Sequence, residues 1–204
     1  MFLRDLLQAF TKELSKTTIP EFVGVICGIG SVYFSRLENI LVYPVGMIST
    51  TIYIYLYIKH GLYADASVNF YYTVMSVIGW VMWTRKKNDT IILKITKSSR
   101  KEHVYAIFFF IGCWGILFLV LKNLTDSTVP WADSFTSAAA FTGMLLMNKK
   151  KIENWFWWTI TNIASIPLNF YKGLAFTSFQ YMVLLVIALM GWVTWAKRMK
   201  ESYK

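Results

Sequence analysis

The sequence predicts an all-α integral membrane protein with seven transmembrane helices in a 3+1+3 parallel repeat. Its 204 residues are 56% hydrophobic, and only 16% are charged, against about 25% in ordinary globular proteins. Apolar runs of roughly 18 residues or more recur along nearly the whole length, as expected of transmembrane helices. The runs lack the alternating pattern of barrel strands, so helices, which satisfy their own backbone hydrogen bonds in lipid, are predicted.

Seven spans are predicted after an N-terminal segment, residues 1–19, that is expected to lie on the membrane as an amphipathic helix. The spans cover residues 21–36, 40–59, 63–84, 104–122, 131–147, 153–171 and 174–196. They group as a first three-helix unit (20–86), a cytoplasmic loop (87–103), a linker helix (104–122) and a second three-helix unit (131–198). The IILKIT core of the loop is expected either to form a short strand or to lie on the membrane surface.

The net charge of +10 follows the membrane topology. Six Lys and Arg fall on the side of the N-terminus, and fifteen fall on the other side. The positive-inside rule therefore predicts an N-terminus outside and a C-terminus in the cytoplasm. Because the basic residues cluster between or after apolar spans, no nucleic-acid partner is predicted. Cys27 and Cys113 lie within spans and are expected to be buried thiols rather than a disulfide.

An internal repeat relates the two three-helix units. The segment beginning LENILVY matches the segment beginning IENWFWW, which pairs Glu38 with Glu153 and Tyr43 with Trp158. After a three-residue gap, GWVMWTRK at 79–86 matches GWVTWAKR at 191–198. Since one linker helix separates the units, both enter the membrane from the same side. Transporters built from parallel repeats of this kind bind their solutes near the bilayer midplane, at the interface between the repeats.

The span 153–171 carries the most informative chemistry. Five of its residues are spaced three, four, three and four apart and so share one helical face: Trp155, Trp158, Asn162, Ser165 and Asn169. Trp155 fits an interfacial aromatic belt as well as a ligand contact. Trp158 and Tyr43 are predicted to sandwich a flat ring, and a cationic ring would gain about 0.5–2 kcal/mol of cation–π attraction. Trp157 is a further candidate that lies off this face.

Amide side chains in the spans have two open interpretations. An unpaired amide costs on the order of several kcal/mol in hydrocarbon, so each must bond either a neighbouring helix or a ligand. Four residues are candidates: Asn69, Asn162, Asn169 and Gln180. Glu38 and Glu153 suit the first turn of a helix, or a cytoplasmic salt bridge that acts as a gate.

No reactive set of residues is visible in the spans. Paired intramembrane aspartates, a His-x-x-x-His motif and a serine near a histidine are all missing, so no catalytic residue, metal site or cofactor is predicted. The alternative from a different class is a structural or sensory membrane protein that transports nothing.

Four sets of motifs resemble the PnuC-type vitamin transporters over residues 20–198: the paired Glu-Asn motifs, GLYAD, the GWVMW and GWVTW ends, and IENWFWW followed by SIPLNFYKGL. The resemblance implies a fold related to the SWEET sugar transporters and a homotrimer in a bacterial inner membrane. It also implies facilitated diffusion of a vitamin precursor that a cytoplasmic kinase traps. Nicotinamide riboside is the first expected substrate, and thiamine or riboflavin is the alternative. Asn69 and Met144 stand where the family often has glutamine, and Asn162 stands where it often has aspartate.

Overall fold

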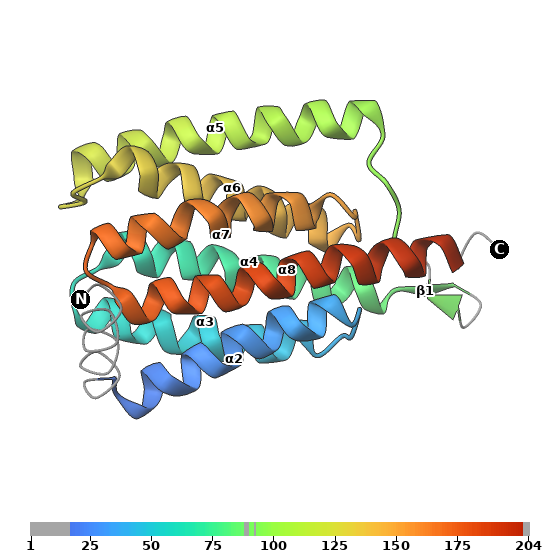
Figure 1. The fold of residues 1–204 in the computed structure, drawn as a ribbon, viewed down its shortest axis with the longest axis horizontal. Helices are drawn as coiled ribbons and strands as arrows, with labels where there is room; N and C mark the ends of the chain where they lie inside the picture. Colours follow the sequence, from blue (N-terminus) through green and yellow to red (C-terminus); the bar gives the residue numbers. More distant parts are fainter. Residues whose placement is uncertain (1–16, 88–89, 92, 202–204) are drawn as a thin grey trace, which may run out of the picture.

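A computed structural model describes residues 17–201 except 88, 89 and 92, so nearly all of the predicted N-terminal segment lies outside the described residues. In this part of the chain, seven long helices run side by side, as Figure 1 shows. They are α2 (Ile19–Arg36), α3 (Val42–Lys59), α4 (Tyr63–Thr84), α5 (Arg100–Leu124), α6 (Pro130–Asn148), α7 (Asn154–Tyr171) and α8 (Ala175–Glu201). Strands β1 (Lys86–Lys87) and β2 (Thr90–Ile91) form a small antiparallel ribbon. The predicted all-helical fold is confirmed, with that ribbon in the predicted loop.

Two helices begin at capping boxes that fix where the loops end. The Thr18 hydroxyl accepts a hydrogen bond from the Glu21 amide, and the Glu21 carboxylate accepts one from the Thr18 amide. Ser99 and Glu102 form the same arrangement at α5, which therefore begins at Arg100 rather than at 104. A capping box satisfies amides that the first turn leaves free. Hydropathy marks only the apolar part of a helix, which explains the difference.

The helices pack as two groups that meet along two seams. Neighbours in sequence contact each other from α2 to α4 and from α5 to α8, while α2 against α8 and α4 against α6 join the groups. Helix α5 lies at the edge of the bundle beside α6 (Figure 1). Within α5, all of which is described, Ala106 alone is buried. Among the described helices, α5 and α8 are the two that are long and apolar enough to cross a membrane by length and composition.

Backbone features recur 112 residues apart. Helices α3 and α7 begin at Val42 and Asn154, and α4 and α8 begin at Tyr63 and Ala175. Positive φ angles occur at Glu38 (54°) and Lys150 (49°), and again at Gly61 (75°) and Gly173 (76°). Such angles are uncommon for residues other than glycine, so their recurrence identifies equivalent turns.

This spacing corrects the predicted pairing in the first part of the repeat. Glu38 is equivalent to Lys150 rather than to Glu153, and Tyr43 is equivalent to Trp155 rather than to Trp158. The position equivalent to Trp158 is Gly46. The Glu-Asn dipeptides lie three residues out of register, because the shared feature is the conformation of the turn and not the residue that occupies it. The predicted match of the two GWV segments has the spacing of 112 and needs no gap.

Candidate functional site

Two matched aromatic pairs form the core at the end of the bundle that carries the C-terminus of α8. Tyr43 packs edge-to-face on Trp83 with ring centroids 5.2 Å apart, and Trp155 packs in the same way on Trp195 at 5.5 Å. Glycine on the third helix of each unit makes room for the ring. An added Cβ would lie 2.4 Å from Tyr43 Cε1 at Gly79, and 2.5 Å from Trp155 Cη2 at Gly191.

The indole N–H groups of this core cross between the two groups of helices. Trp83 Nε1 donates to the carbonyls of Met147 (3.3 Å) and Asn148 (3.2 Å). Trp195 Nε1 donates to the carbonyl of Ser35 at 3.0 Å, and Ser35 is the residue equivalent to Met147. Each third helix is thereby tied to the end of the first helix in the other unit.

Asn148 is a buried polar residue that sequence reasoning missed. It is 1% exposed; its amide nitrogen donates to the Met75 carbonyl at 2.7 Å, and its amide oxygen accepts from the Tyr43 hydroxyl at 3.2 Å. Asn148 lies directly before the lysines at 149–151 and belongs to no periodic pattern of polar residues, so the sequence did not indicate that it is buried. Its equivalent is Arg36, which offers no acceptor. The Trp155 indole N–H is fully buried and has no hydrogen-bond partner among the described residues.

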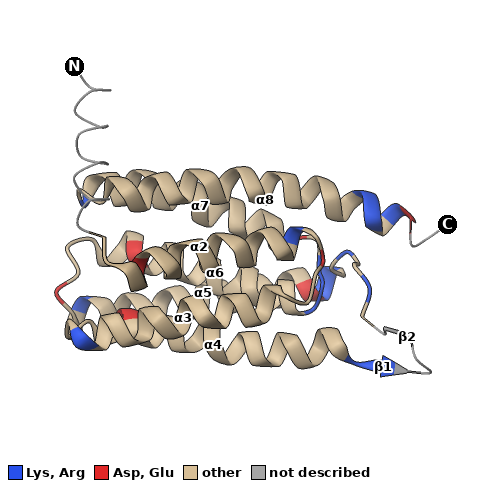
Figure 2. Cartoon of the chain, turned by 90° about the horizontal axis from the view of Figure 1, so that it is seen from below, with Lys and Arg blue, Asp and Glu red and all other residues tan. Residues whose placement is uncertain are grey.

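Glu38 joins three segments through ion pairs at the same end. Its carboxylate lies 2.7 Å from Lys150 Nζ and 3.3 Å from an Arg198 nitrogen. Lys150 is 4% exposed, and its ammonium also sits 4.6 Å from the centroid of the Trp83 ring. Figure 2 shows blue Lys and Arg segments gathered at this end of the bundle, around the red turn. The predicted salt bridge is therefore formed by Glu38, with cations on α8 and on the turn before α7.

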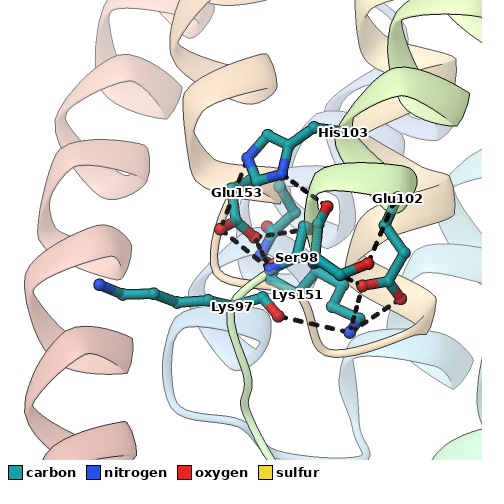
Figure 3. Close-up of polar contacts among 8 residues, drawn as sticks. Lys97, Ser98, Glu102, His103, Lys151 and Glu153 are labelled. Carbon is teal, nitrogen blue, oxygen red and sulfur yellow. Dashed lines mark hydrogen bonds and ion pairs between the residues drawn. The ribbon is translucent and has the colours of Figure 1, made fainter.

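Glu153 instead fastens the α4–α5 loop, as the close-up in Figure 3 shows. The Ser98 amide and hydroxyl donate to its carboxylate at 3.0 and 2.8 Å. Nearby, Lys151 pairs with Glu102 at 2.9 Å. A backbone hydrogen bond from Ser99 and the bond from Lys151 lower the pKa of Glu102 to about 2. The loop is thus held against the turn between α6 and α7.

The predicted face of α7 points into the bundle. Trp155 is 0% exposed, Asn162 is 4% exposed and Ser165 is 2% exposed, while Trp158 is half-buried with its indole against Gly143. No hydrogen bond to the Asn162 side chain is found in the described part of the chain. Buried amides are normally satisfied, so Asn162 has unused capacity to bind a ligand or water.

Other predicted residues are placed differently. The side-chain amides of Asn69 and Asn169 donate to carbonyls of their own helices, at Asp65 (3.0 Å) and Ser165 (2.8 Å). Each keeps its amide oxygen for another partner. Gln180 approaches α2, with its side-chain nitrogen 4.0 Å from the position of an added Cβ on Gly28.

Trp157 faces α5. Its ring centroid lies 5.0 Å from that of Phe110 on α5. Tyr43 lies in the core with its hydroxyl bonded to Asn148. The geometry therefore groups Trp158 and Asn162 on one buried face of α7, with Trp155 near the start of that helix, and leaves Tyr43 and Trp157 engaged elsewhere.

Comparison with known proteins places this geometry in a family. The model for the nicotinamide mononucleotide transporter family matches residues 18–197. A nicotinamide riboside transporter, PnuC, from Escherichia coli is 23% identical and matches 89% of this chain and 86% of its own length. A riboflavin/roseoflavin transporter, RibM, from Streptomyces davaonensis is also 23% identical with the same coverage.

A solved structure supports the fold. The crystal structure of the vitamin B3 transporter PnuC covers 96% of this chain and 90% of its own, with a TM-score of 0.71 and 22% identity. That likeness concerns the arrangement of the helices, and the family model covers nearly the whole sequence. The chain therefore belongs to the nicotinamide mononucleotide transporter family.

Proposed function

We propose that this protein is a multi-pass inner-membrane transporter that takes up a vitamin precursor, with nicotinamide riboside as the first candidate. The observation that carries the proposal is the Asn162 side chain, which is 4% exposed, makes no hydrogen bond within the described chain and lies one helical turn from Trp158. Relatives named as transporters of nicotinamide riboside and of riboflavin support the class of cargo. Riboflavin and thiamine are the alternative cargoes, and the relative RibM specifically favours testing riboflavin.

The proposed architecture is the SWEET-like 3+1+3 arrangement, in which seven helices span the membrane and α5 links two parallel units. The spacing of 112 residues between equivalent turns supports it, and so do the contacts of α2 with α8 and of α4 with α6. A homotrimer and an N-terminus outside belong to the same proposal. The basic residues near Glu38 and in the last turns of α8, at the right in Figure 2, support placing that end of the bundle in the cytoplasm.

In the proposed site, Trp158 stacks on the flat ring of the substrate, and Asn162 bonds its polar groups. A cationic ring such as the N-ribosylated pyridinium of nicotinamide riboside gains about 0.5–2 kcal/mol from an indole face. Trp155, Asn169, Asn69 and Gln180 are proposed as further contacts, and Trp155 supplies an N–H donor that has no partner among the described residues. Tyr43 and Trp157 reach the substrate only if the helices that now hold them move apart.

The transport step in this proposal is a rocking of residues 21–84 against residues 131–196. In the structure, bonds between the two units join the helices at the end with the Glu38 ion pairs. Release of a solute at that end must break those bonds, including the three hydrogen bonds that the Trp83 and Trp195 indoles make between the units. Downhill movement is sufficient if a cytoplasmic kinase phosphorylates the solute and so removes it.

Counterflow in proteoliposomes tests the function and the cargo together. Vesicles are loaded with unlabelled nicotinamide riboside, thiamine or riboflavin, and entry of the labelled compound is measured. We expect exchange of nicotinamide riboside by the wild type and a reduced rate for Asn162→Ala at the same amount of folded protein. Absence of exchange with every compound would contradict the cargo assignment.

A further inference from the structure

The C-terminal part of α8 extends beyond what a bilayer needs. At about 1.5 Å per residue, its 27 residues span about 40 Å, whereas the hydrocarbon core is about 30 Å thick. Its last turns carry Lys197, Arg198 and Lys200. This end of α8 is therefore expected to lie among the lipid headgroups, next to the end of α2.

A groove of about 560 Å³ runs between the end of α2 and the last turns of α8, and is here called the α2–α8 groove. Its wall toward the membrane interior is apolar, with Leu189 52% exposed and Val193 54% exposed. Thr194 follows, and Arg36 and Lys197 line the outer part. The order along the groove is thus apolar surface, hydroxyl and cation.

The two cations are available to an anion. Arg36 donates to the Thr194 hydroxyl at 3.4 Å and approaches the Met190 sulfur at 3.8 Å. Neither Arg36 nor Lys197 has an ion-pair partner in the part of the chain that the structure describes. Arg198, which also lines the groove, is paired with Glu38, and Glu201 adds one carboxylate in the last turn of α8. The groove therefore holds two cations that have no ion-pair partner in the described chain, and one carboxylate in the last turn of α8, beside an exposed apolar wall.

We infer that the α2–α8 groove binds an anionic phospholipid of the adjacent leaflet. The phosphate lies between Arg36 and Lys197, and an acyl chain runs along Leu189 and Val193. A lipid presents charge and hydrocarbon in the same order as the groove does, and basic residues attract anionic lipids at the membrane surface. A small soluble anion would leave the apolar wall uncovered. The inference rests on the membrane location in the proposed function, but not on the cargo.

Thermal unfolding of the purified protein in neutral detergent tests this site. Phosphatidylglycerol, phosphatidylcholine and glycerol 3-phosphate are added separately, because a ligand that binds only the folded state raises the Tm. We expect phosphatidylglycerol alone to raise the Tm of the wild type. The double variant R36Q/K197Q should lose most of that rise. Lys200→Gln is the matched control, since Lys200 lies in the same end of α8 but does not line the groove, and it should keep the rise.

Three results would overturn the inference. The first is an equal rise in the R36Q/K197Q variant, and the second is an equal rise with phosphatidylcholine or with glycerol 3-phosphate. The third is efficient cross-linking of Val193→Cys between two copies in membranes, which would show that a second chain covers the groove. Counterflow keeps the two proposals separate: wild-type protein that responds to the lipid but exchanges no solute would contradict the function and not the lipid site.

Discussion

Helices α3 and α7 hold equivalent positions in the two units, and they are alike at one end and different in the middle. In the first turn of each helix, Tyr43 and Trp155 are both fully buried and both lie on a glycine of the next helix. In the middle, Gly46 of α3 is equivalent to Trp158 of α7, and Thr50 is equivalent to Asn162. The shared features hold the two units together, and the differences are where a ligand can be selected.

The hydrogen bonding of the middle residues sharpens this contrast. The Thr50 hydroxyl is 2.7 Å from the Thr73 hydroxyl, so the first unit satisfies its polar group internally. Asn162 has no such bond in the described chain. Farther out, α3 carries Tyr53 and Tyr57 as a stacked pair with centroids 5.7 Å apart, where α7 carries Ser165 and Asn169. The second unit therefore presents a hydroxyl and an amide where the first presents rings.

Removing the Glu38 carboxylate should have the largest effect on stability. Glu38→Gln leaves the Lys150 ammonium buried without its carboxylate partner, and breaking a buried pair costs about 3–5 kcal/mol. We expect about 3 kcal/mol, because the Trp83 ring still faces the ammonium. Thermal unfolding in detergent measures the loss. Glu201→Gln, at an exposed acid of the same end, should change stability by less than about 0.5 kcal/mol.

Adding Lys150→Met to Glu38→Gln should recover most of that stability, since the buried charge is then gone. A Glu38→Gln variant as stable as the wild type would show that the ion pairs do not hold the two units together.

The two equivalent glycines should respond alike. Gly79→Ala and Gly191→Ala each place a methyl group within about 2.5 Å of a buried side chain. Overpacking of this kind costs about 1–3 kcal/mol. Gly112→Ala on α5, where nothing lies within 4 Å of an added Cβ, should change the free energy of unfolding by less than about 0.5 kcal/mol. Destabilisation of only one of the two glycine variants would break the proposed equivalence.

Trp158→Ala should weaken nicotinamide riboside binding by about 2- to 30-fold, the equivalent of losing about 0.5–2 kcal/mol of cation–π attraction. Isothermal titration measures the Kd. Phe156→Ala, at an exposed ring on the same helix but off the buried face, is the control and should leave the Kd unchanged. Equal weakening by both variants would mean that Trp158 acts through the helix rather than on the ligand.

Glu102 should give the smallest effect, and one that depends on pH. Hydrogen bonds lower the pKa of Glu102 from 4.5 to about 2 in the folded protein. Its contribution to stability is therefore present above pH 4.5 and is lost as the pH falls from 4.5 toward 2. Hydrogen-exchange protection at residues 99–103 should fall in that window. Glu102→Gln should remove the pH dependence there, and an unchanged profile would contradict the role of this carboxylate.

Hydropathy was sufficient to locate the helices, because a long apolar run must either be buried or face lipid, whichever helices it packs against. It did not locate their ends, since α5 begins at a Ser99–Glu102 capping box made of polar residues. The repeat was visible in sequence, but the Glu-Asn dipeptides gave the wrong register over the turn. The equivalent positions there hold Glu38 and Lys150, opposite charges that pair with each other, which sequence similarity cannot detect.

The candidate site was predictable to the extent that it follows helical spacing. The periodicity of α7 placed Trp155 and Asn162 on one buried face. Contacts between distant segments could not be predicted in this way. Asn148 binds both α3 and α4 across the bundle, and Trp157 packs on Phe110 of α5. Those contacts depend on how the two units meet, and no local pattern encodes that.

The most direct test of the central claim is a comparison of nicotinamide riboside affinity in Asn162→Ala and Thr50→Ala, measured by isothermal titration on folded protein. The account predicts a loss for Asn162→Ala of about 0.5–1.5 kcal/mol, the value of one hydrogen bond. It predicts an unchanged Kd for Thr50→Ala, because that hydroxyl already has a partner. Equal affinities for the wild type and both variants, or a larger loss at Thr50, would contradict the assignment of ligand selection to the second unit.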